Sequence, residues 1–226
     1  MHHDDAPLPA DTEHLTEHLA DTLNQTSYDA VAPEWDAARN AFYGRERDYL
    51  DLLLEDMPPA TERPLVLDAG CGTGRPMAEY ALHRGCDVLG IDRSPAMIAL
   101  ASRNLPQARW TVAALEDYPF DEPCHAVILW DCLFHIPRQR HADILGKAVR
   151  ALRPGGRLML TVGGSAHPAF TDVMFGRAFF YDSHPPEQVA DMLRGLACRI
   201  LLGEFMNLPT DGREKGRYAF VVRKAG

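Results

Sequence analysis

Three glycines alternate with other residues in the stretch Gly70-x-Gly72-x-Gly74, and Asp68 lies two positions before the first of them. A glycine turn between a strand and a helix lets the backbone approach a nucleotide-like ligand at the positive end of the helix. The dinucleotide-binding pattern has its third glycine one position later, where this sequence has Arg75. Asp68 suits a ligand that carries positive charge and does not suit a pyrophosphate. The motif therefore predicts a cation-bearing ligand rather than a dinucleotide.

A second carboxylate, Asp92, ends the next apolar stretch, twenty residues after Gly72. At the end of the second strand of a nucleotide-binding unit, a carboxylate can accept hydrogen bonds from both ribose hydroxyls. Enzymes that bind NAD use the same arrangement. Asp92 therefore indicates a ribose-containing ligand, and an NAD(P)-dependent oxidoreductase stays open as an alternative.

Two further side chains could carry acid–base chemistry. Asp131 is the first polar residue after the apolar run Val127–Trp130, and His135 follows four positions later, one turn away if this stretch is helical. Histidine takes up a proton near neutral pH, and a carboxylate beside it could orient the ring or bind a cationic group. We expect Asp131 and His135 to be the catalytic residues. The alternative is that both only fix the loop.

The candidate residues above can act together only if the strands that precede them end at the same edge of one sheet. Short apolar stretches alternate with stretches of helical period, which predicts repeated β-α units and a mostly parallel sheet with helices on both faces. The predicted strands are residues 64–68, 88–92, 109–113, 126–130, 157–162, 200–205 and 218–223. The predicted helices include residues 75–84, a helix that begins at Ser94-Pro95, 139–152 and 187–196.

Three stretches, Val66–Arg75, Gly90–Met97 and Leu152–Leu158, resemble the class I S-adenosylmethionine-dependent methyltransferases, as does Tyr28–Asp36 near the N-terminus. The resemblance covers the chain from about Tyr28 to its end. It implies an α/β, Rossmann-like, doubly wound seven-stranded sheet with the last strand antiparallel, helices on both faces and an N-terminal helical lid. The cofactor would be S-adenosylmethionine, which becomes S-adenosylhomocysteine. The reaction would be methyl transfer to an N, O, S or C nucleophile of a small molecule.

The resemblance also assigns residues to parts of the cofactor. Gly70 and Gly72 would admit its methionine end, Asp68 would suit its cationic groups, and Asp92 would bind the ribose. Tyr28 would meet the amino-acid end. The remaining positions would flank the adenine: Arg93, Met97, Leu115 and Glu116.

One position departs from the family pattern. Many relatives have an Asp, five residues before the proline that matches Pro119, which accepts a hydrogen bond from the adenine amino group. This sequence has Ala114 there. Either Glu116 or the backbone replaces that carboxylate, or adenine is held more weakly.

An aromatic cluster precedes the nucleotide-binding part of the chain. We expect residues 13–60 to form the helical lid over a cofactor-binding domain of residues 61–226, although plain core packing would also explain the cluster. We further expect residues 163–184 to form a long loop that borders the acceptor pocket, because loops of this length are usually functional or disordered. The expected acceptor-binding residues are Trp35, Tyr43, His167, Phe175 and Phe179.

Composition limits the remaining choices. The 226-residue chain has a formal net charge of −9 and no Lys/Arg run, which argues against nucleic acid as a partner. Its five cysteines include no C-x-x-C pair, so we expect reduced thiols in a cytoplasmic protein without a metal site. No apolar run approaches the roughly 20 residues of a membrane span. We expect a small-molecule acceptor, no membrane partner, and disorder in residues 1–12; oligomeric state and a non-catalytic cofactor-binding regulatory role stay open.

Overall fold

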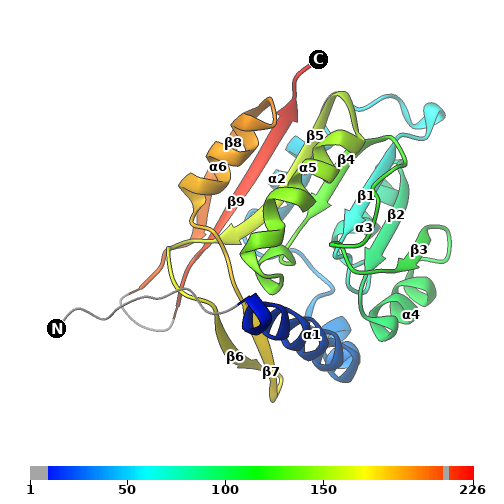
Figure 1. Ribbon diagram of the computed structural model, residues 1–226. Helices are drawn as coiled ribbons and strands as arrows, with labels where there is room; N and C mark the ends of the chain where they lie inside the picture. The colour runs from blue at the N-terminus through cyan, green and yellow to red at the C-terminus, as the bar shows by residue number, and fades with distance from the viewer. Residues whose placement is uncertain (1–9, 211–213) are drawn as a thin grey trace.

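Seven strands form one sheet in the order β3-β2-β1-β4-β5-β9-β8 in the computed structural model, which describes residues 10–210 and 214–226 (Figure 1). Neighbouring strands pair in parallel except around β9, which is antiparallel to both β5 and β8. The predicted doubly wound sheet with an antiparallel last strand is thereby confirmed. The strands of this sheet are β1 (Leu65–Ala69), β2 (Asp87–Asp92), β3 (Arg109–Val112), β4 (Cys124–Leu129), β5 (Leu152–Gly163), β8 (Cys198–Asn207) and β9 (Arg217–Lys224).

Helices cover both faces of the sheet, because successive strand residues point to opposite sides. The helices are α1 (Ala10–Ala38), α2 (Glu46–Leu53), α3 (Met77–His83), α4 (Pro95–Asn104), α5 (His141–Ala151) and α6 (Pro186–Gly195). In β1, Leu67 packs into the core cluster shared with α5 and α6, whereas Val66 packs into the cluster shared with α2 and α3. Short 3-10 turns cover Ala60–Glu62, Leu133–His135 and Arg138–Arg140.

The predicted boundaries hold within a few residues. Ser94 caps α4, as expected, by accepting a hydrogen bond from the backbone N–H of Met97 at 3.1 Å. The helix expected from Arg75 begins only at Met77, with Pro76 as its N-terminal flanking residue. Strand β5 starts at Leu152 rather than Arg157, because Leu152 still pairs with Cys124 across an irregularity in the β4–β5 ladder.

The prediction of a long loop over residues 163–184 is partly wrong. A separate two-stranded hairpin, β6 (Phe170–Met174) and β7 (Arg177–Tyr181), occupies its centre. Phe170 stacks on Tyr181 across the hairpin with ring centroids 5.2 Å apart. The turn is made by Phe175 and Gly176, both with positive φ. Cross-strand aromatic pairs of this kind stabilise a hairpin. The hairpin also buries Phe179 and Phe180.

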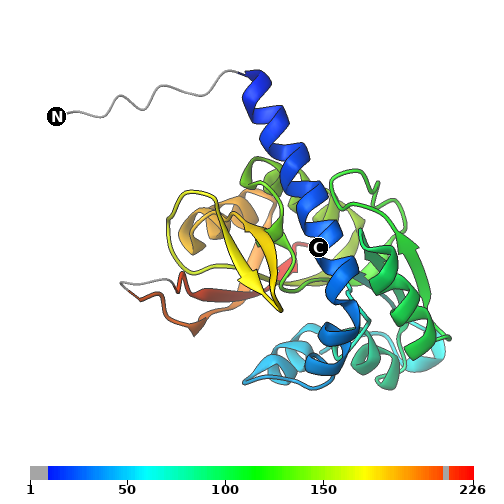
Figure 2. The same cartoon turned by 90° about the horizontal axis from the view of Figure 1, so that it is seen from below.

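Helix α1 runs across the edge of the sheet where the parallel strands end, between β7 and α4 (Figure 2). Ser27 donates a hydrogen bond to the carbonyl of Ala178 at 2.6 Å, which ties the helix to the hairpin. Residues 1–9 of the segment expected to be disordered lie outside the described residues, and residues 10–12 open α1. None of the helices in the described ranges combines the length and apolar character that crossing a bilayer requires.

Candidate active site

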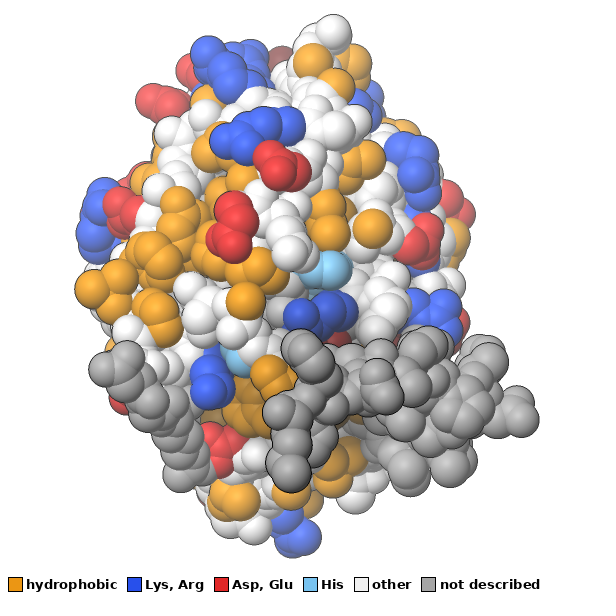
Figure 3. All heavy atoms as spheres, turned by 60° about the vertical axis from the view of Figure 1, so that its left-hand side comes forward, with side chains coloured by type: hydrophobic (Ala, Val, Ile, Leu, Met, Phe, Trp, Pro, Cys, Tyr) orange, Lys and Arg blue, Asp and Glu red, His pale blue; other side chains and the backbone are white. Residues whose placement is uncertain are grey.

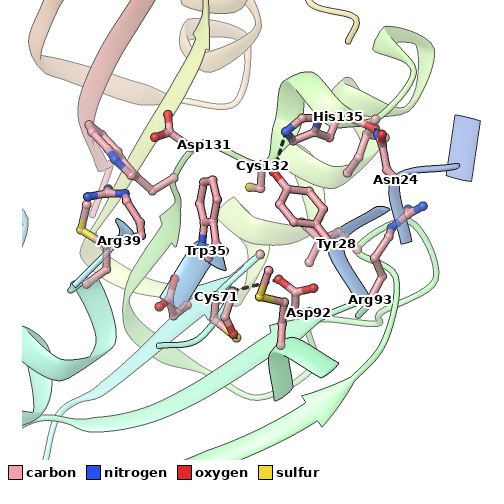
Figure 4. A pocket seen from close by; sticks show the side chains of 18 of the residues that line it. Asn24, Tyr28, Trp35, Arg39, Cys71, Asp92, Arg93, Asp131, Cys132 and His135 are labelled. Carbon is pink, nitrogen blue, oxygen red and sulfur yellow. Dashed lines mark hydrogen bonds between the residues drawn. The ribbon is translucent and has the colours of Figure 1, made fainter. Parts of the chain in front are cut away.

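A pocket lies where the ends of β1, β2 and β4 meet α1 (Figure 4), with an empty volume of about 850 Å³ that includes its mouth. In an open α/β sheet, ligands bind at such strand ends, where the chain switches direction along the sheet. Its lining comes from the glycine loop, the ends of the three strands and one face of α1. The described lining residues are Asn24, Tyr28, Trp35, Arg39, Asp68, Gly70, Cys71, Gly72, Arg75, Met77, Asp92, Arg93, Met97, Leu115, Trp130, Asp131, Cys132, His135 and Ile136.

Asp92 ends β2 with its carboxylate fixed by backbone donors. Oδ2 accepts a hydrogen bond from the N–H of Gly72 at 2.9 Å, and Oδ1 accepts one from the N–H of Ser94 at 2.9 Å. Burial raises the pKa of Asp92, and these two backbone bonds oppose that rise. Each oxygen keeps a second lone pair, so the carboxylate can still accept from two hydroxyls of a ligand.

Asp68 is the last residue but one of β1 and is almost fully buried, yet its Oδ2 has no hydrogen-bond partner. Burial, and secondly the charge of Asp92, raises the pKa of Asp68 to about 7. A buried carboxyl oxygen without a donor is unfavourable. Because the pocket reaches Asp68, a ligand donor or cation would supply the missing partner.

The two predicted ligand-contacting glycines have different reasons to be glycine. Both have positive φ, +82° at Gly70 and +53° at Gly72, which favours glycine. A Cβ on Gly70 would lie 2.4 Å from Cβ of Cys132, so the packing of Cys132 already requires glycine there. A Cβ on Gly72 would lie 3.4 Å from Nε1 of Trp35, on the pocket side. Gly72 is therefore the position where the loop backbone faces the lid.

The far end of the pocket holds the residues expected beside adenine. Arg93, Met97 and Leu115 line it, whereas Glu116 does not. Glu116 lies behind Arg93, with the two charged groups 2.5 Å apart. Its Oε2 is buried without a partner. Glu116 thus holds Arg93 in place, and no carboxylate stands at Ala114.

Tyr28 and His135 form one hydrogen-bonded pair in the pocket wall. Nδ1 of His135 lies 2.9 Å from the carbonyl oxygen of Phe180, and Nε2 lies 2.8 Å from the hydroxyl of Tyr28. A carbonyl only accepts, so Nδ1 carries the proton and Nε2 accepts from Tyr28. Burial lowers the pKa of His135 to about 4, which keeps the ring neutral. Burial also raises the pKa of Tyr28 well above its usual value.

Asp131 follows β4 in a left-handed backbone conformation, with φ +51°. Its Oδ2 accepts from Arg217 at 2.8 Å, and its Oδ1 accepts from the hydroxyl of Thr161 at 3.1 Å. Burial raises the pKa of Asp131, while Arg217 opposes that rise. Asp131 and His135 both line the pocket but bond to different partners. The structure does not join them as a carboxylate–histidine pair.

Of the residues expected to bind the acceptor, Trp35 lines the pocket. Tyr43 is 53% exposed and donates to the carbonyl of Ala38. Phe175 is 47% exposed at the hairpin turn. Phe179 is fully buried behind Tyr28, with ring centroids 4.7 Å apart, and His167 packs on Phe170 at 5.1 Å. All four lie outside the pocket lining. For His167, Phe175 and Phe179 the reason is that the expected loop contains a hairpin with its own packing, whereas Tyr43 lies just after α1 and is exposed.

Eight of the described lining residues were not among the predicted site residues: Asn24, Arg39, Cys71, Arg75, Met77, Trp130, Cys132 and Ile136. Trp130 and Cys132 flank Asp131, so their place could have been inferred from its position. Asn24 and Arg39 could have been predicted more directly, from their spacing in the sequence. Asn24, Tyr28, Trp35 and Arg39 are four, seven and four residues apart, which places them on one face of a helix. Figure 4 shows these side chains directed into the same pocket.

Comparison with known proteins agrees with this geometry. The family described as "Methyltransferase domain" matches residues 66–156, which include the glycine loop, both strand-end carboxylates and β4. This region is a class I S-adenosylmethionine-dependent methyltransferase domain. S-adenosylmethionine is the cofactor of that family.

Similar proteins extend the comparison over more of the chain. A trans-aconitate 2-methyltransferase of Methylobacterium nodulans is 31% identical over 131 residues, which cover 55% of this chain and 48% of that protein. The chain spans about half the length of most curated relatives it matches.

Two solved structures share the fold of the methyltransferase domain. The 1,6-didemethyltoxoflavin-N1-methyltransferase of Burkholderia thailandensis, with bound 1,6-didemethyltoxoflavin and S-adenosylhomocysteine, has a TM-score of 0.65 and 23% identity. The alignment covers 98% of this chain and 93% of that one. The magnesium protoporphyrin IX methyltransferase of Synechocystis, with bound S-adenosylmethionine, has a TM-score of 0.66 and 17% identity over 91% and 97% of the two chains.

The residues of the methyltransferase domain fit this cofactor. The cofactor carries an ammonium, a sulfonium and a ribose, and the pocket holds an unpartnered buried oxygen on Asp68 and two further acceptor positions on Asp92. Within the described residues, no cluster of three His, Cys, Asp or Glu side chains could hold a metal ion.

Proposed function

We propose that the protein transfers a methyl group from S-adenosylmethionine to a small organic acceptor, by in-line displacement at an N, O, S or C nucleophile. The observation that carries this proposal is the continuity of the pocket. Residues suited to the cofactor and aromatic residues of α1 line the same cavity. Relatives and structural neighbours named for trans-aconitate and 1,6-didemethyltoxoflavin support a small acceptor.

Different residues of the pocket suit different groups of the cofactor. When bound, S-adenosylmethionine supplies an activated methyl group on a sulfonium. We assign Asp68 to its ammonium, because Oδ2 is buried and unpartnered. We assign Asp92 to the ribose hydroxyls. Arg93, Met97 and Leu115 would flank the adenine at the far end.

Residues 13–60 act in this proposal as a lid on the domain of residues 61–226. Asn24, Tyr28 and Trp35 on α1 face the glycine loop and exclude water from the acceptor. Alignment of two reactants in a dry site can lower a barrier by several kcal/mol, which is enough when the methyl donor is already activated. The lid is held in place by Asn24, which bonds to backbone groups of His135 and Phe180.

The Tyr28–His135 pair is suited to orienting the acceptor. His135 has its Nε2 lone pair in a hydrogen bond from Tyr28, so the Tyr28 hydroxyl, and not the His135 ring, faces the acceptor. With its own proton committed to His135, Tyr28 presents lone pairs to the pocket. We propose that Tyr28 contacts the acceptor's N–H or O–H group and that His135 positions Tyr28. Asp131, paired with Arg217, would shape the acceptor end.

The surface charge favours a small-molecule acceptor over a nucleic acid. The face in Figure 3 mixes acidic, basic and hydrophobic side chains without a continuous basic field. The net charge of −9 agrees with that view. A nucleic-acid partner would favour a basic stripe along one face.

The test is transfer of label from methyl-labelled S-adenosylmethionine to the small-molecule fraction of a cell extract. We expect label in a small molecule with the unmodified protein and a strong loss with Asp92→Asn. Asp87→Asn, at the opposite end of β2, is the matched control and should transfer normally. Cofactor binding without any transfer would favour the regulatory alternative, and NAD binding in its place would favour the oxidoreductase.

A further inference from the structure

We infer that the acceptor end of the pocket takes a neutral, flat aromatic ring and refuses anions, an inference that rests on the proposed function. The acceptor end is the part beyond the glycine loop, lined by Trp35, Arg39, Trp130 and Asp131. Its charges and its aromatic walls carry the inference separately.

Arg39 contributes no net charge to this end. Its two terminal nitrogens donate to the two carboxylate oxygens of Glu46, at 3.0 and 2.8 Å, and one of them also donates to the carbonyl of Ala41 at 3.0 Å. Glu46 is fully buried, so the pair forms one fixed neutral unit. Bidentate pairing of this kind leaves an arginine little capacity for an incoming carboxylate.

The other lining arginines also form ion pairs. Arg93 pairs with Glu116 at 2.5 Å. Arg75 lies 3.3 Å from Glu79, a longer contact that leaves its buried Nε without a hydrogen bond. Asp131 is neutralised by Arg217 at 2.8 Å.

Among the described residues, these ion pairs leave Asp68 and Asp92 as the lining carboxylates without a salt bridge. S-adenosylhomocysteine carries one ammonium and one carboxylate, so it adds no net charge to offset them. An anion that enters beside it therefore still meets net negative charge, and like charges in one site oppose binding. A cationic acceptor would instead face the cofactor's sulfonium. A neutral acceptor avoids both conflicts.

The walls of the acceptor end are aromatic and held in place. The indole N–H of Trp130 donates to Glu46 at 3.0 Å, which fixes its ring. Trp35 packs edge-to-face on Tyr28, with ring centroids 5.7 Å apart. Figure 4 shows Trp35 standing between Tyr28 on one side and Arg39 and Asp131 on the other. A flat ring can stack or pack edge-on against such indoles, a contact that an aliphatic group cannot make.

Three probes of matched ring size test the inference by calorimetry on the full chain saturated with S-adenosylhomocysteine. Quinolin-2(1H)-one is neutral and flat, quinoline-2-carboxylate adds a negative charge, and octahydroquinolin-2(1H)-one is neutral but not aromatic. We expect quinolin-2(1H)-one to bind tightest, with the carboxylate weaker by at least about tenfold because of like-charge repulsion. trans-Aconitate, a polyanion, should not bind.

Two variants of Trp35 distinguish the loss of a contact to the probe from a general loss of structure. Trp35→Leu should weaken the binding of quinolin-2(1H)-one by about tenfold, the upper range for one aromatic contact. Trp35→Phe should retain much of the affinity of the unmodified protein. Trp110→Phe is the control, because Trp110 lies outside the lining and donates to Leu105.

The outcomes distinguish the inference from the proposed function. Failure of S-adenosylhomocysteine to bind overturns the proposed function, and the inference with it. If S-adenosylhomocysteine binds but the carboxylate or the saturated lactam matches quinolin-2(1H)-one, the inference alone is wrong. Equal affinities in Trp35→Leu and the unmodified protein would also overturn it.

Discussion

At the ends of β1 and β2, Asp68 leaves one buried oxygen unpaired and Asp92 accepts only from backbone N–H groups. At the acceptor end of the same pocket, Arg39 is paired with Glu46 and Asp131 with Arg217. In the cofactor half, Asp68 and Asp92 thus have no salt bridge, whereas the acceptor half neutralises its charges internally.

This difference follows from what each half would bind. Buried carboxylates without a partner destabilise the cofactor-free protein, and a cationic ligand that pairs with them binds more tightly for that reason. A half whose ion pairs are complete is rigid and gains little from another charge. Removing a carboxylate should therefore have opposite effects on folding in the two halves, and the following experiments probe that contrast.

The largest expected effect is in the acceptor half. Glu46→Gln should lower the free energy of unfolding by about 3–5 kcal/mol, because it leaves the buried Arg39 guanidinium without its partner. Urea denaturation measures this loss. Asp48→Asn on the same helix is the matched control. Its exposed pair with Arg45 should contribute less than about 1 kcal/mol. Equal effects of the two variants would contradict the paired description of this half.

Asp68→Asn should do the reverse and stabilise the cofactor-free protein. The folded pKa of about 7 lies above the usual unfolded value, so the stabilising effect of protonated Asp68 is complete below the unfolded pKa and disappears as pH rises through 7. At pH 8 the variant should be more stable by about 2–4 kcal/mol, and at pH 4 the two proteins should be nearly equal. A variant that is less stable at pH 8 would contradict the unpaired description of Asp68.

A smaller effect is expected on cofactor affinity. Asp92→Asn should weaken S-adenosylhomocysteine binding by about 1–3 kcal/mol, because ribose donors would lose a charged acceptor. Calorimetry measures the change. Asp87→Asn, on the same strand but paired with Arg63 at the surface, should leave the affinity unchanged. Weakening by both variants alike would mean that the loss comes from β2 as a whole.

The smallest effect is expected at the hairpin turn. Phe175→Ala should change stability by less than about 0.5 kcal/mol, because the side chain is exposed and far from special packing. It should also leave probe binding intact, whereas Trp35→Leu weakens it. Loss of probe affinity in Phe175→Ala would extend the acceptor half to the hairpin.

The cofactor half could be predicted from the sequence because short, contiguous stretches build it. Asp68, Gly72 and Asp92 come from two neighbouring βα turns whose strand ends must meet in a parallel sheet. Local patterns therefore sufficed for both the fold and these positions.

The acceptor half depends on pairs far apart in the sequence, and patterns did not reveal them. Arg217 neutralises Asp131 from β9, and the carbonyl of Phe180 sets the tautomer of His135. His135 was predicted to be catalytic from its residue type and position. The sequence did not reveal that Tyr28 occupies its Nε2 lone pair or that burial lowers its pKa to about 4. Phe179 was expected to face the acceptor, and the hairpin register turned it into the core behind Tyr28.

Cofactor choice is tested most directly by a calorimetric titration of the unmodified protein with S-adenosylhomocysteine and, separately, with NAD. We expect S-adenosylhomocysteine to bind at one site, Asp68→Asn and Asp92→Asn each to weaken that binding, and NAD not to bind. Binding of NAD without binding of S-adenosylhomocysteine would contradict this expectation, because the unpaired carboxylates would then face a pyrophosphate rather than a cation.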